Sequence, residues 1–104
     1  MKIDAARFDH VAINSSDISA SIKWYSDRFD LEVLYQDSTW GFVKIGNAKI
    51  AFVVAPQHPP HICFSVDESE YDFGKSKFKL HRDGSKSKYI KDPDGNFIEL
   101  LKWN

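Results

Sequence analysis

The sequence predicts an α+β fold made of two βαβββ-like halves. The first observation behind this prediction is an internal echo, in which the strand-like run 8–14 recurs at 60–66 with a histidine near each start. The second is one stretch with the periodicity of an amphipathic helix, and the third is a series of short alternating runs bounded by turn residues. The length of 104 residues fits one domain. We divide it into module one at 1–55, a linker at 56–60 and module two at 61–104.

Module one begins with a strand and a helix. The strand at 8–14 leads into Asn14–Asp17, a cluster of residues that favour helix N-caps. Apolar residues then recur at helical spacing, which predicts an amphipathic helix over about 18–29. The buried stripe of this helix consists of Ile18, Ile22, Tyr25 and Phe29.

The rest of module one is predicted as three strands, at 31–36, 39–45 and 48–55. Asp37-Ser38 and Gly46-Asn47 separate them and are expected to form hairpin turns. The proline-rich linker that follows cannot continue a helix or a central strand, so it marks the end of the module.

Module two repeats this order incompletely. Its strand at 61–66 is followed by about ten residues before the strand-like run 77–81, so we expect the second helix to be short or missing. Strands at 87–91 and 97–103 are joined by the turn 92–96, where Gly95 supplies a positive φ. Symmetric closure of this hairpin pairs Tyr89 with Glu99 across the two strands.

Composition excludes several classes of protein. Lys and Arg number 14 against 15 Asp and Glu, a net charge of -1, so we expect neither nucleic acid nor a membrane as partner. The apolar runs are too short to span a bilayer and the start has no signal-peptide core, so we expect a cytoplasmic location. The single cysteine, Cys63, excludes an internal disulfide and is expected to pack as a small hydrophobe.

Three side chains have the chemistry of a metal site. Strand alternation puts His10 on one face with Ala12 and Asn14, and His61 on one face with Cys63 and Ser65. Glu99 is a carboxylate on an otherwise apolar face, where it needs a cation, a hydrogen-bonding partner or a proton. Two histidines and one carboxylate suit a divalent ion such as Fe, Mn, Ni or Zn and leave coordination positions open. The alternative is that all three are ordinary hydrogen-bonded strand residues.

The sequence also resembles the vicinal oxygen chelate superfamily, which includes glyoxalase I, extradiol dioxygenases, fosfomycin-resistance proteins and bleomycin-resistance proteins. The resemblance spans nearly the whole chain, and its most specific signature is Tyr89–Leu100. Weaker matches are the runs 8–13, 21–25, 31–33 and 61–64. It implies paired βαβββ modules of the glyoxalase, bleomycin-resistance and dihydroxybiphenyl dioxygenase type, with curled mixed β-sheets and a site in the cavity between the modules.

The resemblance also assigns residues. It implies His10, His61 and Glu99 as the metal ligands, whereas relatives with four protein ligands have a further ligand where this chain has Ala51. Relatives of similar size pair modules between two chains, so we expect a homodimer. By the same likeness Tyr89 is a candidate catalytic residue near the substrate, although it is equally interpreted as a packing aromatic. His81 is a second catalytic candidate, as an acid or base, or else a solvent-facing histidine.

Two functions from different classes follow. The first is a divalent-metal enzyme acting on a small substrate that chelates the metal through neighbouring oxygens, by dioxygenase, lyase, isomerase or thiol transferase chemistry. The alternative is a metal-free small-molecule-binding module of the bleomycin-resistance type. The segment 74–91 carries seven basic residues against one acidic residue, which is either a solvated strand edge or a rim that attracts an anionic substrate. His58 is expected to be exposed and is not assigned as a ligand.

Overall fold

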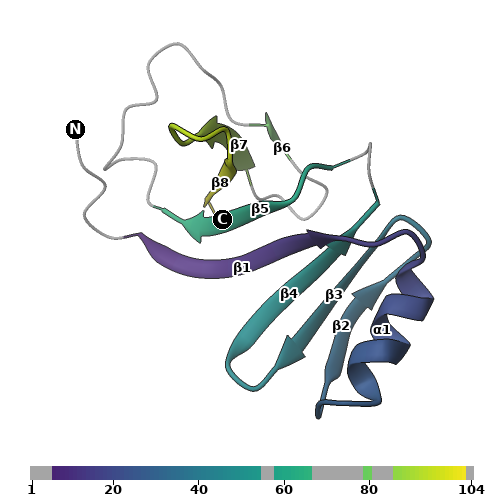
Figure 1. Ribbon diagram of the computed structural model, residues 1–104. Helices are drawn as coiled ribbons and strands as arrows, with labels where there is room; N and C mark the ends of the chain where they lie inside the picture. Colours follow the sequence, from purple (N-terminus) through teal and green to yellow (C-terminus); the bar gives the residue numbers. More distant parts are fainter. Residues whose placement is uncertain (1–5, 55–57, 67–78, 81–85, 103–104) are drawn as a thin grey trace. The chain divides into compact units, whose positions relative to one another are not determined.

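The chain divides into two compact units in a computed structural model that describes residues 6–54, 58–66, 79–80 and 86–102 (Figure 1). The α1 unit comprises residues 10–61, and the β8 unit comprises residues 1–9 and 62–104. The elements, in chain order, are β1 (Arg7–Asn14), α1 (Ile18–Ser26), β2 (Glu32–Gln36), β3 (Trp40–Ile45), β4 (Ala48–Val53), β5 (His61–Ser65), β6 (Lys79–Leu80), β7 (Lys86–Lys91) and β8 (Phe97–Lys102).

The strands of the α1 unit lie in the order β2-β3-β4-β1, and α1 packs on the sheet (Figure 1). β1 runs parallel to β4, with Ala12 opposite Ala51, whereas β2, β3 and β4 are antiparallel neighbours. The sheet of the α1 unit is therefore mixed, with β1 and β4 as a parallel pair. The α+β class that the sequence predicts is confirmed, and the predicted strands match to within one or two residues in this unit.

Each face of this sheet has its own core. On the helix side, Ile18 and Ile22 of α1 pack against Val43 and Phe52. On the opposite face Ala12, Ala51 and Val53 form a second buried cluster, with Trp40 and Phe42 packed against it. Strand alternation thus separates a helix-covered face from an aromatic face that carries Ala12 of the His10 strand.

Helix α1 is shorter than the sequence pattern predicts. It begins after the N-cap Asp17, whose side chain accepts the N–H of Ala20, and it ends at Ser26 instead of 29. Phe29 therefore lies beyond the helix and is 49% exposed, so its place in the predicted buried stripe is wrong.

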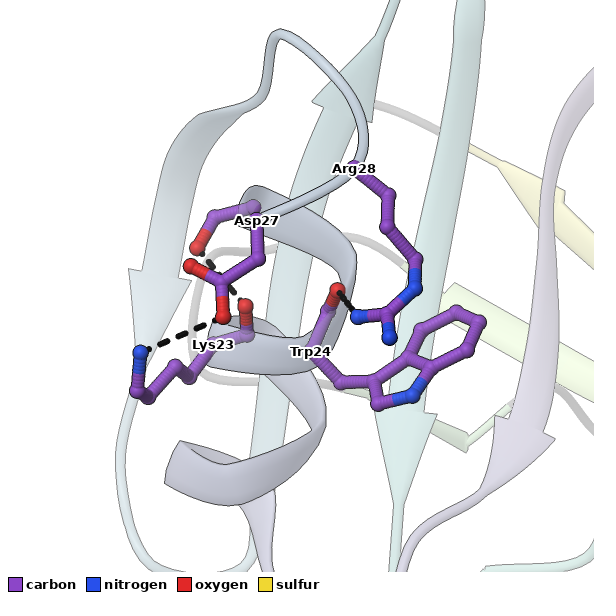
Figure 2. A network of polar contacts seen from close by, with 5 residues as sticks. Lys23, Trp24, Asp27 and Arg28 are labelled. Carbon is purple, nitrogen blue, oxygen red and sulfur yellow. Dashed lines mark hydrogen bonds and ion pairs between the residues drawn. The ribbon is translucent and has the colours of Figure 1, made fainter.

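The early end of α1 has a local cause (Figure 2). The guanidinium of Arg28 donates to the Trp24 carbonyl at 2.9 Å and lies 3.9 Å above the Trp24 ring. The N–H groups of Arg28 and Phe29 both donate to Tyr25, which forms a closing turn. Because these bonds satisfy carbonyls of the last helical turn, the chain does not need a further turn of helix to do so.

The turns of the α1 unit are set by one glycine and one aspartate. Gly46 has a φ of +59° at the first central position of the two-residue turn between β3 and β4, as predicted for a hairpin there. Between β2 and β3 the expected two-residue turn is longer, because Gln36 pairs with Gly41. The Asp37 carboxylate accepts the N–H groups of Thr39 and Trp40 at 2.8 and 2.9 Å and so fixes this longer turn.

In the β8 unit, the strands lie in the order β5-β8-β7-β6. The β7–β8 hairpin has the predicted register, with Tyr89 opposite Glu99 and Lys91 opposite Phe97. Gly95 has a φ of +85°, as its place in the turn requires. The predicted short or missing second helix lies outside the described residues, as do the ends of the strand predicted at 77–81. The module boundaries at 55, 56–60 and 61 stay a prediction.

Each half of the chain has a backbone hydrogen bond at a corresponding position. The N–H of Ser15 donates to the Val53 carbonyl at 2.9 Å, and the N–H of Val66 donates to the Leu101 carbonyl at 2.8 Å. These bonds occupy corresponding positions after the first strand and near the end of the last strand of each half. The internal echo in the sequence is therefore a structural repeat. In the described part of the chain, no helix is long and apolar enough to cross a membrane.

Candidate functional site

The α1 unit brings two of the predicted ligands together. His10 lies on β1 and His61 is the first residue of β5, and their ring centroids are 5.6 Å apart. A ring nitrogen of one lies within 4.8 Å of a ring nitrogen of the other. Two nitrogens bound to one ion at about 2.1 Å each are roughly 3 to 4 Å apart, so small ring rotations suffice for the pair to share a metal.

A hydrogen bond fixes the tautomer of His61. Its Nδ1 lies 2.8 Å from the carbonyl oxygen of Pro59, two residues earlier. A carbonyl only accepts, so Nδ1 carries the proton and Nε2 of the neutral ring carries the lone pair. Metal-binding histidines are commonly oriented in this way by a bond from the other ring nitrogen. The proline linker thus does more than separate two modules, because it orients one candidate ligand.

A row of aromatic rings extends from the histidine pair across the sheet of the α1 unit. The ring of His10 lies 5.3 Å from Phe42, Phe42 lies 5.8 Å from Trp40, and Trp40 stacks on Tyr35 at 4.7 Å. The Tyr35 hydroxyl donates to Asp37, the same carboxylate that fixes the β2–β3 turn. Ring contacts therefore fix the row along its length, and the Asp37 carboxylate links its last member, Tyr35, to the backbone of the β2–β3 turn.

Other large side chains of the α1 unit do not belong to this row. Trp24 is 51% exposed on α1, and Phe52 is buried in the helix-side core. Trp103 lies outside the described residues. Ala51, which stands where four-ligand relatives have a further ligand, is buried opposite Ala12.

The β8 unit holds the third candidate ligand, Glu99. This residue is 8% exposed on β8, directly across from Tyr89 of β7. On the other side β8 neighbours β5, where the thiol of Cys63 is fully buried and hydrogen-bonded to the Glu99 carboxylate. Glu99 therefore lies between a phenol on β7 and a thiol on β5, and the thiol donates to its carboxylate.

The ionisation of these two neighbours is suppressed. Burial raises the pKa of Cys63, and the negative charges of Glu99 and Asp9 and the hydrogen bond to Glu99 raise it further. Burial, followed by the charges of Glu99 and Cys63, also raises the pKa of Tyr89. Both groups therefore stay protonated at neutral pH and act as hydrogen-bond donors rather than as anions.

The residue that sequence reasoning missed is Cys63. It packs in a buried position as expected, but it is more than a small hydrophobe because it contacts the candidate ligand Glu99. The signal was present in the strand alternation, which put Cys63 on the His61 face. Ile62, on the opposite face of the strand, is 41% exposed.

The remaining predicted residues have different outcomes. His58 is exposed, as predicted. His81 lies outside the described residues, so its catalytic role stays a prediction. Most of the basic segment 74–91 lies outside them as well, and within the described part Lys91 is exposed with its ammonium 5.0 Å from the Phe97 ring centroid.

The fold and the donor residues define a class of protein, and comparison with known families identifies it. The family model of the Glyoxalase/Bleomycin resistance protein/Dioxygenase superfamily matches residues 7–100. The chain belongs to this superfamily. The resemblance recognised in the sequence is thereby confirmed.

Individual relatives agree with the family. The metallothiol transferase FosB of Staphylococcus epidermidis is 30% identical over an alignment that covers 88% of this chain and 78% of that protein. A hypothetical protein from Bacillus halodurans has a similar structure, with a TM-score of 0.72, 15% identity and coverage of 97% of this chain and 96% of that one. A superfamily member from Vibrio splendidus has a TM-score of 0.67 at 14% identity, covering 95% of this chain and 100% of that one. The two structural matches establish the glyoxalase-like fold.

Proposed function

We propose that this protein is a divalent-metal enzyme that transfers a thiol to a small substrate with neighbouring oxygens. His10, His61 and Glu99 are the proposed ligands, and the ion is Fe, Mn, Ni or Zn. The observation that carries the proposal is the histidine pair in the α1 unit, with the His61 tautomer fixed so that Nε2 can bind a metal. The buried carboxylate of Glu99 in the β8 unit supplies the charge that such a pair lacks.

The donor set fits a catalytic ion. Two imidazoles and one carboxylate are the ligands of many catalytic sites, and they leave positions for a substrate. A bound divalent ion supplies a Lewis acid that polarises a chelating substrate. Ala51 supports a three-ligand arrangement, because its methyl group cannot add a fourth protein ligand at that position.

Thiol transfer is the chemistry that the FosB likeness favours. In such a step the thiol sulfur forms a bond to an electrophilic carbon of the substrate while a carbon–oxygen bond breaks. The departing oxygen takes up the proton that the thiol releases, so no oxidant or reductant is needed. Tyr89, opposite Glu99 and protonated at neutral pH, is the first candidate to donate a hydrogen bond to a substrate oxygen in this proposal. His81 remains the second candidate acid or base.

Two further features concern the substrate. The row Tyr35, Trp40, Phe42 suits an apolar group of the substrate next to the histidine pair. The basic segment 74–91 suits an anionic group. A homodimer, as expected from the size of the chain, is part of the same proposal.

The function is tested by metal-dependent consumption of a thiol. The protein is loaded with Mn(II), Ni(II), Fe(II) or Zn(II) and mixed with a low-molecular-weight thiol and small anionic electrophiles that carry neighbouring oxygens. Loss of free thiol and the mass of the adduct are measured. We expect turnover that chelator abolishes and that Glu99→Ala and His10→Ala both lower by at least about 100-fold.

A matched control is available in the exposed histidine of the linker. His58→Ala makes the same substitution as His10→Ala at a residue outside the proposed ligand set, and we expect it to keep full activity. Binding of the small molecules without any metal requirement, and without turnover, would instead support the metal-free binding module.

A further inference from the structure

Cys63 occupies a position that is determined by the internal repeat. It lies on β5, whose neighbour in the sheet is β8, and its side chain is 0% exposed. The hydrogen bond from Val66 to Leu101 matches the bond from Ser15 to Val53 in the other half. In that other half Ala12 lies directly opposite Ala51. The repeat therefore places Cys63 beside Glu99, where the other half has two alanines.

The alanine pair and the cysteine–glutamate pair differ in whether a buried polar group needs a hydrogen-bond partner. At the alanine pair two methyl groups pack inside an apolar cluster, and no polar atom needs a partner. At the corresponding pair in the β8 unit a carboxylate is buried, and the residue beside it carries a weak donor of small volume. A thiol fits the space of a small hydrophobe and still gives the carboxylate a hydrogen bond.

We infer that Cys63 is a positioning residue for Glu99. Its thiol donates a hydrogen bond to one carboxylate oxygen and so leaves the other oxygen directed for metal binding. Tyr89 lies directly opposite Glu99 on the other neighbouring strand, β7. This role rests on the proposed function, since it assumes that Glu99 is a metal ligand, and it adds a residue to the machinery beyond the three ligands.

Physical chemistry gives the expected size of the effect. Groups that orient a metal ligand through a hydrogen bond typically change metal affinity about 10- to 100-fold when they are removed. Cys63→Ala removes the donor and leaves a small void, whereas Cys63→Ser keeps a donor of nearly the same size. If Cys63 only packed, Cys63→Ser would disturb the site more than Cys63→Ala, because serine buries a more polar group than alanine in an apolar site.

The experiment measures Co(II) affinity by titration calorimetry in the wild type, Cys63→Ala and Cys63→Ser. We expect Cys63→Ala to bind Co(II) about 10- to 100-fold more weakly and Cys63→Ser to remain within about threefold of the wild type. Ser87→Ala is the matched control, because Ser87 is a small buried residue of the same unit that lies opposite Leu101 instead of Glu99. Its Co(II) affinity should equal that of the wild type.

The visible and near-ultraviolet spectrum of the wild type with Co(II) adds a readout that needs no variant. We expect d–d bands without an intense thiolate-to-cobalt charge-transfer band, because the thiol contacts Glu99 and not the metal. A charge-transfer band would make Cys63 itself a ligand and overturn the positioning role. Equal Co(II) affinity of Cys63→Ala and wild type would overturn it while leaving the proposed function intact. A wild type that binds no Co(II) would overturn both.

Discussion

Glu99 is a carboxylate on a strand whose neighbouring inward positions are apolar, and its burial has to be offset by its neighbours. Cys63 and Tyr89 flank it from the two adjacent strands. Both stay protonated because burial and the Glu99 charge raise their pKa values. The hydrogen bond from the Cys63 thiol offsets part of the cost of burying the carboxylate.

Replacing Glu99 by glutamine separates its structural role from its proposed role as a ligand. The amide has nearly the same size, and its single carbonyl oxygen can still accept the hydrogen bond from Cys63. It does not carry the desolvation cost of a charge. We expect the free energy of unfolding of the metal-free Glu99→Gln protein, measured in urea, to lie within about 1 kcal/mol of the wild-type value. Metal affinity should fall by more than about 10-fold, because a neutral amide is a poor ligand for these ions. Unchanged affinity would remove Glu99 from the ligand set.

How far the site could be predicted from sequence depends on the residue. Strand alternation was enough to associate His10 with one small polar face. Symmetric closure about the 92–96 turn paired Tyr89 with Glu99, and this register is confirmed. The bond from His61 to the Pro59 carbonyl depends on the local path of a proline linker, which no residue pattern specifies. The contact between Cys63 and Glu99 was missed because the two residues lie on different strands, 36 residues apart in the sequence. The internal repeat could have predicted it, because the corresponding residues of the first half, Ala12 and Ala51, lie opposite one another.

At the scale of an element, the β7–β8 hairpin depends on one carboxylate. Asp92 accepts the N–H groups of Asp94 and Asn96 and the side-chain amide of Asn96, each at 2.9 Å. The bond from the Asn96 side chain, followed by the backbone bonds, lowers the pKa of Asp92 below 3.8. The turn that carries Glu99 on its outgoing strand is therefore sensitive to acid.

The acid sensitivity gives a prediction with a definite sign. Because the folded-state pKa lies below the unfolded value of 3.8, this stabilisation is fully present above that pH and is lost as the pH falls through the folded-state pKa. Asp92→Asn should therefore flatten the acid limb of a plot of unfolding free energy against pH. Asp94→Asn removes the same charge from the same turn and should leave that limb steep. If both variants behave alike, general charge and not the hydrogen bonds of Asp92 controls the turn.

The packing of α1 on its sheet depends on Gly41. A Cβ built at this position would lie 2.9 Å from Ile18 Cγ2 and 2.9 Å from Ile22 Cδ1, closer than real Cβ contacts. We expect Gly41→Ala to destabilise the protein by about 1 to 3 kcal/mol in urea unfolding. Ile22→Val removes the Cδ1 atom, so the double variant should lose less stability than the sum of the two single variants. Strict additivity would show that the helix already has room at this point.

The elements themselves were largely predictable, and the exceptions have physical causes. Apolar periodicity placed the start of α1 but not its end at Ser26, because the Arg28 guanidinium donates to the Trp24 carbonyl of the last turn. Turn residues placed the hairpin at Gly46, whereas the Asp37 side chain builds a longer turn than a pattern of two polar residues indicates. In both places a side chain makes a hydrogen bond that a backbone group would otherwise make. Such bonds depend on single residues, and hydrophobic periodicity does not predict them.

At the scale of the whole molecule, the proposed ligand set draws on both units. His10 and His61 belong to the α1 unit and Glu99 belongs to the β8 unit. An ion held by all three would bind the folded chain and not the unfolded one, so it would stabilise both units together. The small size of the chain makes this contribution important, because a domain of about 100 residues is only marginally stable by itself.

This coupling predicts a rise in stability with metal concentration. At a free metal concentration about 100 times the dissociation constant, binding to the native state alone adds about 2.7 kcal/mol to the free energy of unfolding. Thermal unfolding with and without Zn(II) or Mn(II) measures it. Metal should raise the unfolding midpoint of the wild type and of His58→Ala equally, and it should leave the midpoint of His10→Ala unchanged. A metal-independent midpoint in the wild type would contradict the coupling.

The most direct test of the account is the metal content of the protein. Wild type, His10→Ala, His61→Ala, Glu99→Ala and the control His58→Ala are dialysed against Fe(II), Mn(II), Ni(II) or Zn(II), freed of unbound ion and analysed by inductively coupled plasma mass spectrometry. We predict about one ion per chain in the wild type and in His58→Ala, and loss of that ion in each of the three ligand variants. Absence of any retained metal in the wild type, or an ion kept by all three ligand variants, would contradict the metal site and with it the proposed chemistry.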